Sequence, residues 1–177
     1  NNVVGRFDLY RTMRTISTPM ASSNAERKVI PEKQAKMDFD QRKTPYRNAI
    51  GILSYIANSM QPDIIFAVNY LSRKQELYGK KEWEQVKRVF RYLNRTANLG
   101  IRFSSESDGV ECYIDASLGL NEELGKSTSG YVVTLFGDPV AWKTSLQQQV
   151  ALSSAEAEYV AMSLACKQLV STQVLAK

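Results

Sequence analysis

Apolar residues recur at helical spacing through the middle of the chain. They fall three or four positions apart in three successive stretches, at about residues 46–59, 63–76 and 81–96, and this spacing predicts three helices. Pro62 suits the first turn of the second helix, and Gly79 ends it. Because the connections are short, we expect the three helices to pack as a small bundle.

The pattern becomes typical of strands beyond residue 108. Strands are predicted at residues 110–116, 129–136 and 140–144, with a turn at 137–139 that contains Asp138. Successive strands with short connections favour an antiparallel meander. The sequence therefore predicts the α+β class, with a small helical bundle followed by a three-stranded meander and one more helix.

The last helix is predicted from about residue 153 to 175, a run without Gly or Pro. In its first turns, ALSSAEAEYVAM, Ser153 and Glu156 have the spacing of a capping box, so we expect Glu156 to cap the helix. Successive helical residues are rotated by about 100°, which points Glu158 to nearly the opposite side. Glu158 continues a stripe that we expect to face the sheet, formed by Ala161, Met162, Ala165 and Leu169.

Two carboxylates, Asp115 on the first strand and Glu158 on the last helix, are predicted to converge. Carboxylate oxygens are the ligands that Mg²⁺ takes from proteins, so the pair forms the beginning of a divalent-metal site. Each residue also has a simpler interpretation, since Glu158 can be a hydrogen-bonded carboxylate favoured by the helix dipole and Asp115 a turn-forming residue. Ser127 and Ser129 are predicted to be turn residues without a base to activate them.

The composition is that of an ordinary globular protein. The chain has 177 residues, of which 44% are hydrophobic and 23% charged, enough for one medium domain or two small ones. No apolar run approaches the ~20 residues of a membrane span, and the N-terminus lacks the apolar core of a signal peptide. We therefore expect an intracellular protein without membrane contact, with Cys112 and Cys166 reduced and mostly buried.

The sequence contains no histidine. Within this chain, that excludes Ser-His-Asp and Cys-His catalysis, histidine-ligated zinc and a histidine proton shuttle. The first residue is not Met, which indicates an internal piece of a longer chain.

The net charge of +5 is concentrated in the third predicted helix and its approach. Between Arg73 and Arg95, eight Lys and Arg stand against three Glu. A basic helix is typical of a protein that binds a polyanion, but a solvated helix face with a few ion pairs has the same pattern. The candidate nucleic-acid-binding residues are Lys80, Lys81, Lys87, Arg88, Arg91 and Arg95.

The order of several motifs closely resembles the C-terminal part of the Pol polyprotein of Ty1/copia-type LTR retrotransposons. The resemblance covers nearly the whole chain and begins with ISTPM, TPYRNAIGILSYIANSMQPDIIFAVNYLSR and WEQVKRVFRYLNRTANLGIRF. Its most specific part is the succession of KSTSGY, AWK and ALSSAEAEY. By this resemblance, the polar residues 1–45 are a connector after the polymerase palm, 46–100 a thumb or connection segment, and 108–177 a truncated ribonuclease H-like domain.

The resemblance implies a reaction and its partners. Ribonuclease H domains cut the RNA strand of an RNA–DNA hybrid with two Mg²⁺ ions held by a cluster of acidic residues. Asp115 matches the family's first-strand Asp, and Glu158 matches its helix Glu. We accordingly expect a nucleic-acid partner, contact with the remainder of the Pol polyprotein, and a location in a cytoplasmic retrotransposon particle, with the nucleus as the alternative.

Two further carboxylates of the family lie beyond Lys177, and the palm is not in this chain. We therefore expect a full-length form to cleave hybrids and the 177-residue chain to have little or no nuclease activity and no polymerase activity. Other departures favour a degenerate or domesticated remnant that binds nucleic acid or a protein without catalysis. The motif IDASLGL replaces SDADWAG, Gln61 replaces an Arg, and Gly125 replaces a basic residue.

Overall fold

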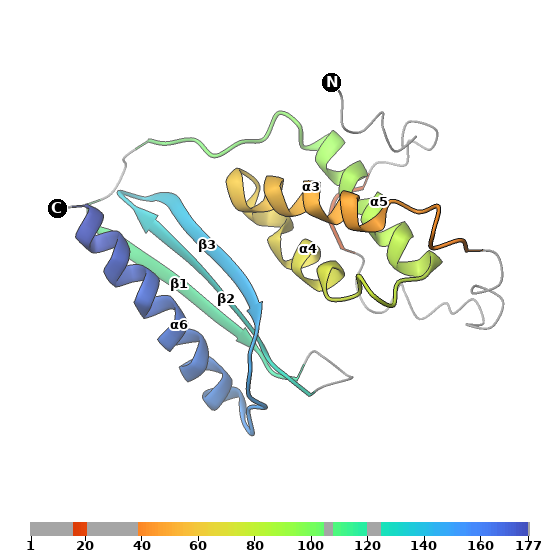
Figure 1. Ribbon diagram of the computed structural model, residues 1–177. Helices are drawn as coiled ribbons and strands as arrows, with labels where there is room; N and C mark the ends of the chain where they lie inside the picture. Colours follow the sequence, from red (N-terminus) through yellow and green to blue (C-terminus); the bar gives the residue numbers. More distant parts are fainter. Residues whose placement is uncertain (1–15, 21–38, 105–107, 120–124, 177) are drawn as a thin grey trace. The chain divides into compact units, whose positions relative to one another are not determined.

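The computed structural model describes residues 16–20, 39–104, 108–119 and 125–176. The chain divides into two compact units, residues 1–100 and 101–177. The first is helical, and the second is a sheet with one long helix (Figure 1). The described elements confirm the predicted α+β class. The prediction for residues 1–45 falls mostly outside the described residues.

The helical unit contains α3 (Tyr46–Ser59), η3 (Pro62–Ile64), α4 (Ile65–Ser72) and α5 (Lys80–Arg95). The bounds of α3 and α5 agree with the predicted helices to within a residue. Apolar side chains at helical spacing from all three α-helices pack together in one core, and the large residues among them are buried. Its largest fully buried side chains include Tyr46, Ile50, Leu53, Leu71 and Phe90.

The second helix is shorter than predicted, because a 3-10 turn forms its first residues and α4 ends at Ser72. Side chains near this end bond to the preceding turn. The Ser72 hydroxyl donates to the Asn69 carbonyl at 2.7 Å, and the Arg73 guanidinium donates to the Asn69 side-chain oxygen. Local bonds of this kind compete with continuation of a helix. The expected continuation to residue 76 is therefore wrong.

The second unit contains β1 (Val110–Ser117), β2 (Thr128–Leu135), β3 (Asp138–Leu146) and α6 (Ser154–Leu175). The strands form an antiparallel sheet in the order β1-β2-β3, which confirms the predicted meander. In Figure 1, α6 lies along β1 and covers one face of the sheet. Tyr131 and Val133 of β2 are buried there against Ala165 of α6.

A two-residue turn joins β2 to β3. Both of its residues, Phe136 and Gly137, have positive φ, as type I′ hairpins require. Asp138 is not in this turn, as the sequence predicted, but is the first residue of β3 and pairs with Leu135. Its buried carboxylate accepts hydrogen bonds from the Ser104 amide, at 2.9 and 3.1 Å. Asp138 therefore anchors the segment that enters the sheet unit.

Candidate functional site

The start of α6 positions the two glutamates differently. The Ser153 hydroxyl accepts the Glu156 amide at 3.1 Å, and the Glu156 carboxylate accepts the Leu152 amide at 2.7 Å. Glu156 is thus a capping residue, as predicted. Two residues further on, about 200° around the helix, the Glu158 carboxylate accepts the backbone amide of Ala116 at 3.3 Å. Glu158 is half-buried against the end of β1.

Asp115 immediately precedes the residue that Glu158 contacts. Alternate side chains of β1 point to opposite faces, and those of Cys112 and Ile114 pack against the core under α6. Asp115 belongs to the other, exposed set together with Tyr113. It pairs across the sheet with Gly130, so no side chain from β2 stands opposite it. The structure therefore brings Glu158 to the backbone beside Asp115 and leaves the Asp115 carboxylate open to solvent.

A buried polar cluster lies under the first turn of α6. The Gln147 amide nitrogen donates to the Ser129 hydroxyl and to the Ala157 carbonyl, both at 2.8 Å. The side-chain oxygen of Gln147 is buried without a hydrogen-bond partner. Since Ala157 precedes Glu158, these bonds hold the helix turn that carries the candidate carboxylate. The cluster links the end of β3, the beginning of β2 and α6.

Several sequence predictions around this site need correction. Ser129 lies within β2 rather than in a turn, and both Ser127 and Ser129 are buried. Met162 does not face the sheet but is 47% exposed, because it lies about 100° around the helix from buried Ala161. Cys166 is exposed and Cys112 half-buried, so the expectation of two buried thiols fails for Cys166.

The carboxylate oxygens of Asp115 and Glu158 are of the kind that Mg²⁺ binds, but two carboxylates limit the number of ions that can be held. A single Mg²⁺ can bind through one or two carboxylates and keep several waters. Asp115 and Glu158 are of the right kind, but the structure places Glu158 at the Ala116 amide and Asp115 among the exposed side chains of β1. In the described ranges, no group of three or more acidic, Cys or His residues could hold a metal ion. Two carboxylates do not make a two-metal centre.

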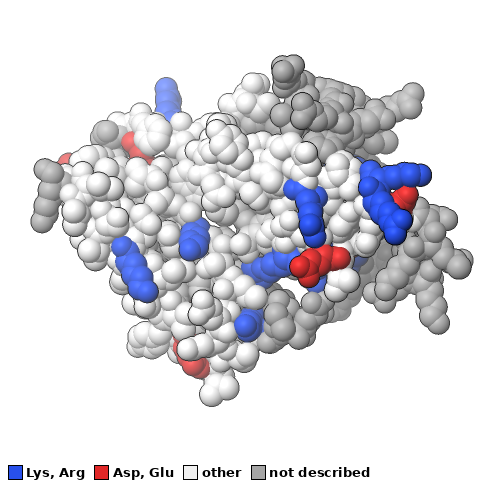
Figure 2. Space-filling view, viewed as in Figure 1, with Lys and Arg blue, Asp and Glu red and all other residues white. Residues whose placement is uncertain are grey.

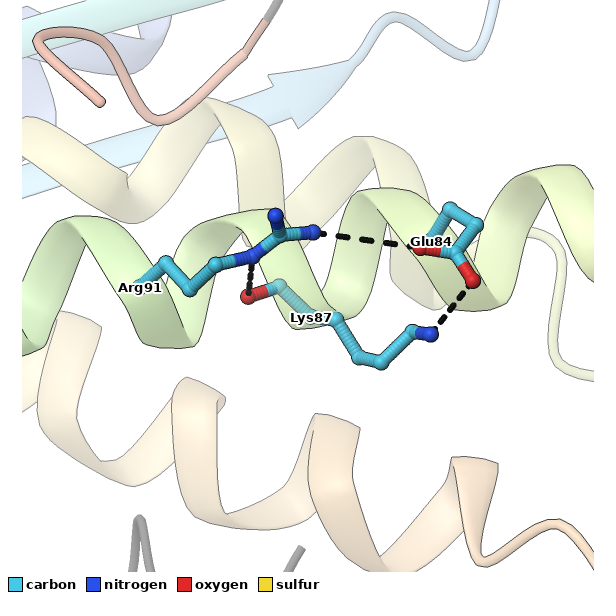
Figure 3. Close-up of polar contacts among 3 residues, drawn as sticks. All are labelled: Glu84, Lys87 and Arg91. Carbon is cyan, nitrogen blue, oxygen red and sulfur yellow. Dashed lines mark hydrogen bonds and ion pairs between the residues drawn. The ribbon is translucent and has the colours of Figure 1, made fainter. Parts of the chain in front are cut away.

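The basic residues of α5 are partly engaged within the helical unit. Lys87 and Arg91 both pair with Glu84, and Arg91 also donates to the Lys87 carbonyl (Figure 3). Arg88 donates to the carbonyl and the hydroxyl of Thr18, at 3.2 and 3.0 Å. The basic side chains in the middle of α5 are therefore bonded to other groups of the helical unit.

The ends of α5 present their charge to solvent. Lys80, Lys81 and Arg95 are exposed, and the structure gives them no ion pair with any residue it describes. Figure 2 shows Lys and Arg side chains on one face of the molecule, some of them next to Asp or Glu side chains. Of the six predicted contacts with nucleic acid, these three are therefore the most available.

In the described part of the chain, no helix is long and apolar enough to cross a membrane.

Curated proteins similar to this chain come largely from transposons. The retrovirus-related Pol polyprotein from transposon TNT 1-94 of Nicotiana tabacum is 33% identical over 168 residues, which are 95% of this chain and 13% of that polyprotein. The corresponding polyprotein from transposon RE2 of Arabidopsis thaliana is 34% identical over 149 residues, 84% of this chain and 10% of that polyprotein. The secreted RxLR effector protein 161 of Plasmopara viticola is 36% identical over 130 residues, 73% of this chain and 92% of that protein.

The chain belongs to the Ty1/copia-type retrotransposon Pol polyproteins. This confirms the resemblance carried by the KSTSGY, AWK and ALSSAEAEY motifs. The Pol segment described here spans only about a tenth of the two full polyproteins to which it is similar. No protein-family model matches the chain, and no solved structure matches it.

Proposed function

We propose that this Pol segment contains the thumb or connection of a reverse transcriptase, in residues 46–100, followed by a truncated ribonuclease H domain, in residues 108–177. In this proposal, Asp115 and Glu158 supply the first two carboxylates of a Mg²⁺ site in the complete enzyme, which cleaves the RNA strand of RNA–DNA hybrids. The supporting observation is the bond from the Ala116 amide to Glu158, which holds the helix carboxylate at the residue that follows Asp115 in a chain of this family. A cytoplasmic particle, or the nucleus as the alternative, is the location that goes with this function.

The proposal also predicts that residues 1–177 alone have little or no nuclease activity. Two unit charges 4 Å apart interact by about 4 kcal/mol at an effective dielectric of about 20, and two divalent cations repel about four times as strongly. Asp115 and Glu158 carry only two negative charges to offset that repulsion. We therefore expect a hybrid-cleaving centre only where further carboxylates join this pair.

The test compares a longer Pol polyprotein with residues 1–177 on a labelled RNA–DNA hybrid in Mg²⁺. The longer protein should cleave the RNA strand, and its Asp115→Asn variant should lose at least about a hundredfold of the rate, since loss of a charged ligand weakens metal binding. Intact hybrid with the longer protein would contradict the ribonuclease assignment. Efficient cleavage by residues 1–177 would contradict the claim that the pair is insufficient.

A second, non-enzymatic function has its own observation, the exposed Lys80, Lys81 and Arg95 at the ends of α5. A segment that binds nucleic acid through three such charges should show a slope of about −2.7 for log K against log salt on duplex substrates, at about −0.9 per phosphate contact. The Lys80→Ala, Lys81→Ala double variant should reduce the slope to about −0.9. Lys43→Ala, which alters an exposed lysine outside α5, is the control. A salt-independent affinity would rule this function out.

A further inference from the structure

A closed path of contacts surrounds the turn of α6 that carries Glu158. The Ala116 amide donates to the Glu158 carboxylate at 3.3 Å, and Ala116 lies directly opposite Ser129 in the ladder between β1 and β2. The Gln147 side-chain amide donates to the Ser129 hydroxyl and to the Ala157 carbonyl, both at 2.8 Å. Because Ala157 is the residue before Glu158, the path runs through β1, β2 and Gln147 and returns to the same turn of the helix.

The Gln147 side chain can join two elements because its amide nitrogen carries two hydrogens. It donates both to a hydroxyl of β2 and to a backbone carbonyl of α6. The main chain of Gln147 is also fixed, since its backbone amide donates to the Ser127 carbonyl at 2.8 Å. A carboxylate or an alkyl group at this position has no hydrogen to donate, so the bridge between β2 and α6 depends on the side-chain amide.

The contacts of Gln147 are shielded from water. Gln147 is 5% exposed, Ser129 2% and Ala157 0%. Polar groups buried in this way cannot exchange their partners for water, so they hold their geometry more strictly than exposed groups do. Glu158 itself is only half-buried and accepts a longer hydrogen bond. Its position therefore depends on the buried side of the turn, where Gln147 lies.

The helix cap supports the same turn from the other direction. Ser153 and Glu156 bond to the amides of Glu156 and Leu152, and these three residues are exposed. The bonds of the cap stay within the start of α6 and do not reach the sheet. Among the described hydrogen bonds, those of the Gln147 side chain connect the Ala157 carbonyl to β2.

We propose that Gln147 is a positioning residue, which fixes the Glu158 carboxylate at the end of β1 by bridging β2 and α6. Its amide is buried under the helix and acts through the helix turn, not on a ligand. Loss of a hydrogen bond that supports a metal-binding side chain typically lowers metal affinity by about 10- to 100-fold. The consequence for Mg²⁺ rests on the proposed function, whereas the positioning of Glu158 does not.

Amide hydrogen exchange in residues 1–177, measured by NMR, tests the positioning. Gln147→Met removes both donors but keeps a side chain of similar length. It should speed exchange of the Ala116 amide by at least about tenfold relative to the Tyr131 amide, which lies in the central strand of the sheet. Gln148→Met, at the exposed neighbouring position, should leave both exchange rates unchanged.

Two further variants separate positioning from general stability. Val133→Ala leaves a cavity in the core of the sheet unit and should raise the exchange rates of Ala116 and Tyr131 alike. If Gln147→Met also raises the two rates alike, or changes neither, the proposal is overturned. Ser129→Ala removes one of the two acceptors and should give a smaller selective change, of about threefold, with a milder effect on folding.

A Glu158→Ala background shows whether Gln147 acts through Glu158. In this background the acceptor of the Ala116 amide is absent, so Gln147→Met should have no further selective effect on that amide. The same selective increase with and without the Glu158 carboxylate would overturn the proposal, because Gln147 would then act on β1 by another route.

Cleavage by a longer Pol polyprotein separates this inference from the proposed function. Where the longer protein cleaves RNA–DNA hybrids, Gln147→Met should raise the Mg²⁺ concentration for half-maximal rate by about tenfold and leave the KM for the hybrid unchanged. An unchanged Mg²⁺ dependence would overturn the role of Gln147 at the metal site. If the unaltered longer protein cleaves no hybrid, the proposed function fails, and the exchange rates alone decide whether Gln147 positions Glu158.

Discussion

The two units use their apolar residues in different ways. The helical unit surrounds large side chains such as Tyr46, Leu53 and Phe90 with three helices. The sheet unit buries Tyr131 and Val133 against Ala165 of α6, and Leu164 and Leu169 of the same helix pack partly buried against them, while other apolar side chains of α6 are exposed. The first unit therefore encloses its large apolar side chains, whereas the described part of the second unit leaves several large apolar side chains of α6 exposed.

The largest expected difference between the units lies in the cost of removing a core side chain. Phe90→Ala should lower the free energy of unfolding of the helical unit by about 3–5 kcal/mol, and Val133→Ala that of the sheet unit by about 2 kcal/mol. Trp83 of α5 and Trp142 of β3 report on the units separately in denaturant titrations if each is read in a variant with the other changed to Phe. Tyr55→Ala, at a 72% exposed position, is the control. Equal losses of unfolding free energy in the two variants, or a larger loss in Val133→Ala, would contradict this difference between the units.

The next expected effect concerns the polar cluster under α6. Gln147→Leu removes the donor to Ser129 and Ala157 and should destabilise the sheet unit by about 1–3 kcal/mol, since it leaves buried acceptors unsatisfied. Gln148→Leu makes the same change at the exposed neighbouring position and should have little effect. Trp142 fluorescence during urea unfolding measures both. If the two variants unfold alike, the cluster does not hold the helix turn before Glu158.

A smaller effect is expected at the helix cap. Ser153→Ala removes the acceptor of the Glu156 amide and should cost about 1 kcal/mol, while Ser154→Ala, one residue inside the helix, should cost little. Thermal unfolding followed by circular dichroism distinguishes the two. A loss at Ser154 equal to that at Ser153 would contradict the capping assignment.

A further expected effect, confined to alkaline pH, is a loss of stability of the helical unit. The hydrogen bond from the Tyr92 hydroxyl to Asp63, with burial as a lesser cause, raises the pKa of Tyr92 to about 12. Because the unfolded value is about 10, this contribution to stability is fully present below pH 10 and is lost as the pH rises through 12. Tyr92→Phe should therefore make the free energy of unfolding of the helical unit, followed by Trp83 fluorescence, depend less on pH in this range. An unchanged profile would assign the alkaline loss to other groups, such as Tyr46, whose pKa burial also raises.

Periodicity was enough to predict most of the secondary structure. The hydrophobic spacing places α3 correctly because Ile50, Leu53 and Ala57, which carry that spacing, are buried. It misses the end of α4, where side chains of Ser72 and Arg73 bond locally to Asn69. It also places Asp138 in the turn, because a pattern of turn-forming residues does not distinguish the turn itself from the first paired residue of the next strand.

Less of the candidate site than of the secondary structure could be predicted from the sequence. The rotation between Glu156 and Glu158 follows from helix geometry alone, and the cap at Glu156 agrees with it. Gln147 gave no signal, because it begins a run of three glutamines that is typical of a loop, and its role depends on contacts with Ser129 and Ala157 far along the chain. Periodicity does not separate the exposed side of α6 from its buried side, because the helix is apolar on both; the pattern therefore predicts Met162 on the inner side, although it is 47% exposed.

In the proposed enzyme, Glu158 and not Glu156 supplies the metal-binding carboxylate of α6. The most direct test measures cleavage of an RNA–DNA hybrid by a longer Pol polyprotein with Glu158→Gln or Glu156→Gln. Glu158→Gln should remove nearly all of the activity, whereas Glu156→Gln, in which the amide oxygen can still accept the Leu152 amide, should retain most of it. Full activity in Glu158→Gln, or equal losses in the two variants, would contradict the account.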